Sequence, residues 1–293
     1  MDMELQHFIQ MLEWNPPGTP EHAAAMWESR ADAWAKDYDD PDKRKSDDRI
    51  QVTVDYLTKR GLLDPDFDVA DVGCGPGRFV VAFARMVRHV TGIDISEKMI
   101  RYGMEYAEKE NLSNTAFLVR DFQALDIEQE NLAGRFDLVF CSITPAMHGI
   151  RGVENAMKMS RKYCCHISHI NSTNELESRI MREVFGRERP DPWAGHWRWF
   201  YAVFNVLFLM GYYPEATYYN RHQDKAIFPE RERAELLVRQ LLPAEEHTPE
   251  NKERVYAWLQ SNADNGRLTE ASDVLYGRLL WDVREKTERP VSL

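Results

Sequence analysis

Three glycines at alternate positions follow a short apolar run in the segment Val69-Ala70-Asp71-Val72-Gly73-Cys74-Gly75-Pro76-Gly77. Glycine permits positive φ and lets a ligand approach the backbone closely, and a helix predicted from Arg78 offers free amides to a negatively charged group. Asp94 ends the next strand-like segment, about 20 residues after the first glycine, where a carboxylate can accept hydrogen bonds from ribose hydroxyls. Together these residues predict a site for a nucleoside-containing cofactor.

The spacing of the glycines distinguishes between two kinds of cofactor site. A dinucleotide site usually has the pattern G-x-G-x-x-G, whereas this chain has G-x-G-x-G with Asp71 two positions before the first glycine. Here the chain resembles the class I S-adenosylmethionine-dependent methyltransferases, whose first motif has the form D-x-G-x-G-x-G. The resemblance covers about residues 45 to 170 and continues in order through Asp94, Arg120-Asp121-Phe122 and Phe136-Asp137-Leu138-Val139.

The resemblance implies a role for each matching residue. Asp71 would lie near the ammonium group of the cofactor, and Asp94 would hold its ribose. The other implied cofactor-binding residues are Gly73, Cys74, Gly75 and Gly77 at the methionine part, Ile95 and Met99 against ribose and adenine, Asp121 and the Phe122 amide at the adenine, and Ser142 at the end of the fourth strand. The alternative for Asp94 and Asp121 is that each caps the helix that follows it.

A loop after the fourth predicted strand carries the candidate catalytic group. In an open α/β sheet the ligand lies beyond the carboxyl ends of the strands, so the loop from Ser142 to Gly149 should face the transferable methyl group. His148 is the first candidate for a general base, because neutral imidazole can accept a proton near pH 7. The alternative is a histidine that only makes local hydrogen bonds. Tyr38 is the second candidate, since N-terminal residues of this family often touch the cofactor.

Aromatic residues concentrate near the N-terminus and between residues 193 and 213. The expected acceptor pocket draws on both regions and consists of Trp34, His196, Trp197 and Tyr201. Trp197, Tyr201, Phe204 and Phe208 recur at helical spacing, which is typical of core packing. The alternative is a lid that excludes water from the reaction.

The elements that must position these residues alternate between strand-like and helix-like segments. This alternation predicts an α/β protein with parallel strands covered by helices on both faces, and the resemblance specifies a Rossmann-like methyltransferase fold: a mostly parallel, twisted sheet with a helical cap. The expected division is an N-terminal helical cap (1–45), a cofactor-binding core (46–172), an aromatic-rich helical insertion or lid (173–211) and C-terminal strands and helices that complete the sheet and cap (212–293).

The charge and composition of the chain disfavour several classes of partner. The 293 residues carry a formal charge of −11 without a strong basic patch, which disfavours nucleic acid and anionic membranes as partners. The four cysteines have neither disulfide nor zinc spacing, and Cys164, Cys165, His166 and His169 alternate between the two faces of a predicted strand, so no metal is expected. No apolar run is long enough to span a bilayer, and the chain is expected to be cytoplasmic. Its aromatic surface could pair with another chain.

The expected function is therefore transfer of the methyl group of S-adenosylmethionine to a small-molecule acceptor, with release of S-adenosylhomocysteine. One alternative is an NAD(P)-dependent oxidoreductase, which the glycine spacing disfavours. The other is a non-catalytic S-adenosylmethionine-binding module, which remains open because methyl transfer needs little beyond alignment of the two reactants.

Overall fold

The computed structural model describes residues 3–13, 24–32, 48–190, 195 and 197–287. The strands are β1 (Asp68–Val72), β2 (His89–Asp94), β3 (Thr115–Val119), β4 (Phe136–Ser142), β5 (Ser160–Asn174), β6 (Glu215–Ile227) and β7 (Leu268–Asp282). The helices are α1 (Met3–Leu12), α4 (Arg49–Lys59), α5 (Arg78–Ala84), α6 (Glu97–Lys109), α7 (Ile150–Met159), α8 (Glu175–Phe185), α9 (Trp197–Leu209), α10 (Arg231–Leu241) and α11 (Pro249–Asn262), with short 3-10 turns at Pro145–Met147 and Ala244–Glu246. Residues 24–32 are also helical.

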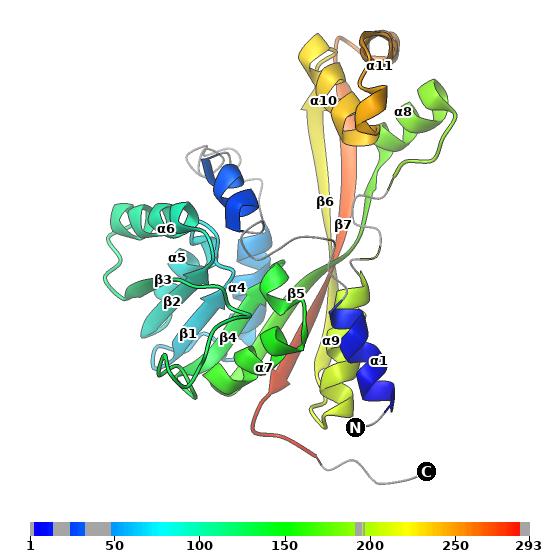
Figure 1. Cartoon of the computed structure of the whole chain (residues 1–293). Helices are drawn as coiled ribbons and strands as arrows, with labels where there is room; N and C mark the ends of the chain where they lie inside the picture. The colour runs from blue at the N-terminus through cyan, green and yellow to red at the C-terminus, as the bar shows by residue number, and fades with distance from the viewer. Residues whose placement is uncertain (1–2, 14–23, 33–47, 191–194, 196, 288–293) are drawn as a thin grey trace. The chain divides into compact units, whose positions relative to one another are not determined.

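The strands form one seven-stranded sheet in the order β3-β2-β1-β4-β5-β7-β6. The pairs β1–β2, β1–β4, β2–β3 and β4–β5 are parallel. Figure 1 shows the arrows of β6 and β7 pointing in opposite directions, so the sheet is mixed. The predicted α/β class with a mostly parallel sheet is confirmed.

Helices cover both faces of the parallel strands. Phe140 in β4 packs against Phe79 and Phe83 of α5, with ring centroids 4.8 and 5.1 Å away. Cys165 pairs with Phe140 across the β4–β5 ladder, so its neighbour Cys164 points to the opposite face, where its thiol donates to the Ala156 carbonyl of α7. Because both faces are covered, β4 is buried from Phe136 to Cys141 and has no polar-out alternation.

An ion-pair network holds together the amino-terminal ends of β1, β4 and β5. Asp137 is 3% exposed at its side chain and accepts hydrogen bonds from the Asp68 amide at 2.9 Å and from Arg161 Nε at 2.9 Å, while Lys162 Nζ lies 2.9 Å away. Burial on its own would raise the pKa of Asp137, but the hydrogen bonds from Arg161, the Asp68 amide and Lys162 outweigh it and lower the pKa to about 2. Asp137 therefore fixes the end of the sheet opposite to the glycine turn.

The chain divides into two compact units, and the boundaries fall within β5, after the first residue of α9, and within β6 and β7. Unit 1 contains residues 1–168, 198–217 and 277–293, and unit 2 contains residues 169–197 and 218–276. Unit 2 has a hydrophobic core of its own, formed by Leu176, Ile180, Met181, Ile227, Ala234, Leu237, Val238, Leu241, Leu242, Val255, Leu259 and Leu268. The division expected from the order of strand-like and helix-like segments, with boundaries near residues 45, 172 and 211, stays a prediction.

Over the described ranges, every helix is too short or too polar to cross a membrane. The four cysteines are all buried free thiols. Within the same ranges, His, Cys, Asp and Glu side chains do not gather into a group that could hold a metal ion.

Candidate functional site

The glycine turn joins the carboxyl end of β1 to α5. Gly73, Gly75 and Gly77 have φ values of 66, 52 and 79°, in the left-handed region that glycine adopts without strain. The amides of Gly73 and Cys74 donate to the Ile93 carbonyl of β2 at 2.8 and 3.1 Å. The turn is therefore anchored to the neighbouring strand.

Gly73 is also required by the loop that follows β4. A Cβ atom at position 73 would lie 2.0 Å from Thr144 Oγ1, well inside van der Waals contact. Thr144 itself caps the short turn after it, because its Oγ1 accepts from the Ala146 amide at 3.2 Å. The glycine turn and the loop after β4 therefore meet at the carboxyl edge of the sheet.

Asp94 connects the glycine turn to the start of α6. Its Oδ2 accepts from the Gly75 amide at 2.9 Å, and its Oδ1 accepts from the Ser96 amide at 2.9 Å. Burial raises the pKa of Asp94, while the amides of Ser96 and Gly75 act in the opposite direction. The predicted ribose-binding residue thus lies directly beside the predicted glycine turn, and it also caps the first residues after β2.

Asp71 is a buried acid with an unused hydrogen-bonding atom. It is 2% exposed, and its Oδ2 makes no hydrogen bond with any residue that the structure describes. Burial, followed by the negative charge of Asp94, raises the pKa of Asp71 to about 8. A buried carboxyl without a partner costs free energy that a bound cation could recover, so this position fits the ammonium group of a ligand.

The loops after β3 and β4 are tied together by side-chain amides. Asp121 Oδ1 accepts from the Gln123 amide at 3.1 Å, and Gln123 Nε2 donates to the carbonyls of Pro145, at 3.0 Å, and His148. Phe122 is buried, and its carbonyl accepts from Asn155 Nδ2 at 2.8 Å. Asp121 and Phe122 therefore lie in a loop whose position relative to His148 is fixed.

Three other predicted cofactor residues occupy the same edge. Met99 is 1% exposed in the first turn of α6, and Ile95 is half-buried between β2 and that helix. The hydroxyl of Ser142, at the end of β4, is buried and has no hydrogen-bond partner among the described residues. The next residue, Ile143, has a φ of 51°, a strained conformation for a β-branched residue and one often found at functional sites.

His148 lies against the indole of Trp199. The two rings are stacked, with centroids 3.7 Å apart and planes inclined by 8°. The His148 backbone is held by its amide, which donates to the Pro145 carbonyl at 2.8 Å, and by Gln123 at its carbonyl. The candidate base is thus oriented by an aromatic residue of α9 that the sequence analysis did not select.

Only part of the acceptor pocket expected from the sequence falls within the described residues. Trp34, His196 and the second catalytic candidate, Tyr38, lie outside the described residues. Trp197 and Tyr201 are each 46% exposed, and the Tyr201 ring packs edge-on against Phe8 of α1. The prediction that this face of α9 packs in the core is wrong, because α9 buries the face that carries Trp199, Phe200, Ala202, Val203, Val206 and Leu207.

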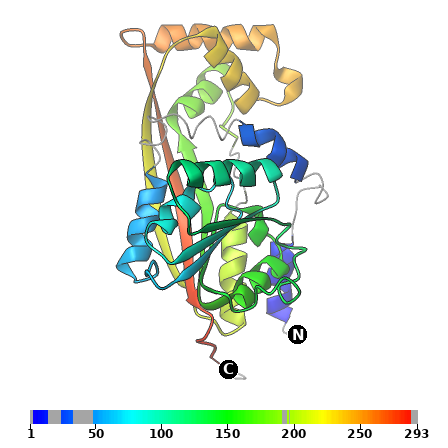
Figure 2. The same ribbon diagram turned by 90° about the vertical axis from the view of Figure 1, so that its left-hand side faces the viewer.

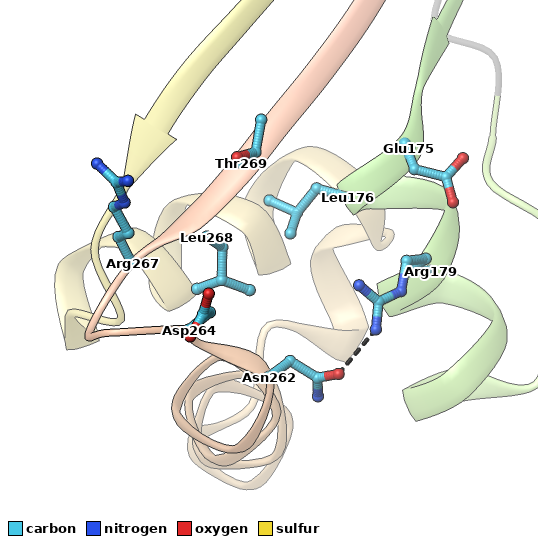
Figure 3. Close-up of a pocket in the computed structure, with 8 residues that line it drawn as sticks. All are labelled: Glu175, Leu176, Arg179, Asn262, Asp264, Arg267, Leu268 and Thr269. Carbon is cyan, nitrogen blue, oxygen red and sulfur yellow. Dashed lines mark hydrogen bonds between the residues drawn. The ribbon is translucent and has the colours of Figure 1, made fainter.

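Two depressions lie apart from the glycine turn. One, of about 540 Å³ between α1 and α9, is lined by Met3, Glu4, His7, Phe8, Asn205, Phe208 and Leu209. The other, of about 320 Å³ within unit 2, is lined by Glu175, Leu176, Arg179, Asn262, Asp264, Arg267, Leu268 and Thr269 (Figure 3). In the second, Arg179 donates to Asn262 Oδ1 at 2.7 Å and lies over Trp258, so its guanidinium holds α8 and α11 together.

Comparison with known proteins supports the interpretation of the glycine turn as part of a methyltransferase domain. Residues 63–185 match the family model described as a methyltransferase domain. Over 73 residues the chain is 37% identical to a ubiquinone biosynthesis O-methyltransferase of Acinetobacter baumannii (strain AYE), which is 25% of this chain and 30% of that protein. Over 81 residues it is 32% identical to a 23S rRNA (uracil(1939)-C(5))-methyltransferase of Alcanivorax borkumensis, which is 28% of this chain and 16% of that protein.

The matched segments thus span less than a third of the length of either relative. Among solved structures, the [4+2]-cyclase SpnF has a TM-score of 0.51 with 16% identity, over 90% of this chain and 97% of that one, which shows a shared fold. The motif order and the sheet agree with the family match, which assigns a methyltransferase domain to residues 63–185.

Proposed function

We propose that this protein binds S-adenosylmethionine and transfers its methyl group to a small-molecule acceptor, leaving S-adenosylhomocysteine. The observation that carries the proposal is the position of Asp94, whose two carboxylate oxygens bind the amides of Gly75 and Ser96. This contact joins the glycine turn, the end of β2 and the start of α6 into one surface. Beside it, Asp71 supplies a buried carboxyl that a cationic ligand would satisfy.

In this proposal each part of the cofactor has its own residues. Asp71 pairs with the ammonium group, and Asp94 accepts hydrogen bonds from the ribose hydroxyls. Asp121 accepts from the adenine amino group, and the Phe122 amide donates to the ring. The remaining contacts come from the backbone of Gly73, Cys74, Gly75 and Gly77, from Ile95 and Met99, and from Ser142.

The protein's own contribution to the reaction is alignment and proton removal. Bound S-adenosylmethionine supplies a methyl group that its sulfonium already makes electrophilic, so the acceptor atom needs only an in-line approach. Holding two reactants in such a pose lowers a barrier by about 7–11 kcal/mol. We assign His148 the role of accepting the acceptor's proton, with Trp199 fixing the plane of its ring.

Electrostatics favours a small molecule over nucleic acid as the acceptor. The chain has a formal charge of −11, and the Asp94 carboxylate lies at the site itself. A phosphate backbone would be repelled by this surplus, since nucleic-acid affinity rests on neutralising lysines and arginines. The stacked Trp199 and His148 instead suit an acceptor with an apolar or aromatic body.

We predict that Asp94→Ala weakens the binding of S-adenosylmethionine by roughly 1.5–3 kcal/mol, the scale of hydrogen bonds to a charged group. Isothermal titration calorimetry on the folded variant measures this loss. Asp55→Ala removes an exposed carboxylate from α4 and serves as the control, with unchanged affinity expected. Wild-type affinity in Asp94→Ala would show that Asp94 does not bind the ribose.

We predict that the affinity for S-adenosylmethionine rises with pH from 6 to 8. The pKa of Asp71 is about 8 in the free protein, so the carboxyl is mainly protonated below that pH, whereas a bound ammonium group stabilises its ionised form. Binding should therefore release a proton, and the affinity should increase by up to tenfold per pH unit until Asp71 is ionised. Calorimetry in two buffers of different ionisation enthalpy measures the proton release.

The variant Asp71→Asn has no carboxyl to titrate and should lose this part of the pH dependence. Equal proton release by Asp71→Asn and the wild-type protein would show that another group is responsible.

We predict that the wild-type protein transfers labelled methyl groups from S-adenosylmethionine to the low-molecular-weight fraction of a cell extract, and that His148→Ala lowers the rate by about 10²–10⁴-fold near pH 7, the range for a lost general base. Trp199→Leu retains His148, so it should reduce the rate less than His148→Ala does. Near-normal turnover of His148→Ala from pH 6 to 9 would exclude His148 as the base, and label found only in RNA would contradict the proposed acceptor class.

A further inference from the structure

A short helix outside the family match contacts the cofactor edge of the sheet. Residues 24–32 precede the matched segment 63–185 and lie beside α6 in both views (Figures 1 and 2). The Glu28 carboxylate accepts hydrogen bonds from Ser96 Oγ and, at 3.3 Å, from the Lys98 amide. Asp32, one turn further along, accepts from the Tyr102 hydroxyl at 2.8 Å and lies 3.3 Å from Lys98 Nζ.

Ser96 links Glu28 to Asp94. It is 1% exposed, and each of its polar groups has a defined partner. The hydroxyl donates to Glu28 and accepts from the Met99 amide at 3.2 Å, which makes Ser96 the N-cap of α6. Its backbone amide donates to Asp94 Oδ1 at 2.9 Å. A displacement of Ser96 would therefore move one of the two groups that hold the Asp94 carboxylate.

The negative charge of Glu28 is favourable at this position. A carboxylate at the N-terminus of a helix interacts favourably with the free amides and the helix dipole, and Glu28 lies at the start of α6. It is also close enough to Asp94 to act on it electrostatically: burial is the main cause that raises the pKa of Asp94, and the charge of Glu28 adds to that shift. The two carboxylates therefore share the same small region, separated by Ser96.

We propose that Glu28 is a positioning residue for the cofactor's ribose, because it holds Ser96 and through Ser96 fixes the carboxylate of Asp94. The inference rests on the proposed function, in which Asp94 binds the ribose. It extends the cofactor site to residues 24–32. Since the ribose is common to S-adenosylmethionine and S-adenosylhomocysteine, both compounds should depend on Glu28 to the same degree.

Variants of Glu28 and Asp32 distinguish a role of Glu28 in positioning Asp94 from a role in attaching the helix of residues 24–32 to α6. Glu28→Ala removes the acceptor of the Ser96 hydroxyl, and Glu28→Asp keeps the charge but is one methylene too short to reach it. Glu28→Gln keeps an acceptor oxygen at full length. Asp32→Asn is the matched control, because Asp32 joins the same helix to α6 without touching Ser96.

The measurement is the dissociation constant of each compound by calorimetry, together with the melting temperature of each ligand-free variant. We expect Glu28→Ala and Glu28→Asp to bind both compounds about tenfold more weakly. Glu28→Gln should stay within about threefold of the wild-type protein, and Asp32→Asn should bind normally. In an Asp94→Ala background, Glu28→Ala should have no further effect, since the two residues act through one contact.

Two outcomes overturn the role of Glu28. One is wild-type affinity in Glu28→Ala and Glu28→Asp, even with a lowered melting temperature, which would make the contact structural only. The other is a full additional tenfold loss from Glu28→Ala in the Asp94→Ala background. A wild-type protein that binds neither compound would instead contradict the proposed function itself, and the role of Glu28 with it.

Discussion

The carboxylate of Asp94 is the contact on which the arrangement of the site depends. Its two oxygens bind the Gly75 amide of the glycine turn and the Ser96 amide at the start of α6. This geometry requires β1 and β2 to be parallel neighbours, so that their carboxyl ends lie together, and it requires left-handed φ values in the turn. The same residue that is placed to bind ribose therefore also holds together the loops that form its surroundings.

The parts of the fold that the sequence predicted well have strong local signals. The apolar run before the glycine turn forms β1 (Asp68–Val72), and the run before Asp121 forms β3 (Thr115–Val119), because short apolar runs bounded by turns are typical of strands. β5 extends beyond the residues that the sequence marked as strand. The predicted strand carries Cys164, Cys165, His166 and His169, and β5 runs from Ser160 to Asn174. Among its added residues, Asn171 and Thr173 are exposed and Ser172 is half-buried, and all three are polar, so no apolar pattern marks them as strand.

The contacts that complete the site could not be predicted, because they join residues far apart in the chain. Glu28 and Ser96 are 68 positions apart, and neither the stack of His148 on Trp199 nor the packing of Thr144 on Gly73 leaves a periodic signal. α9 shows a second reason why the sequence could not predict the site. Aromatic and aliphatic residues surround the whole helix, so its period alone could not decide that Trp199 is buried while Trp197 and Tyr201 are exposed.

The most direct test of the account is a calorimetric and thermal-shift comparison of S-adenosylmethionine, S-adenosylhomocysteine, NAD and NADP on the purified protein. A ligand that binds only the folded state stabilises it by mass action and so raises the melting temperature, more so at higher ligand concentration. We expect binding and stabilisation by the two adenosyl compounds and none by NAD or NADP. Stabilisation by NAD or NADP alone would contradict the assignment of the glycine turn and of every cofactor residue that depends on it.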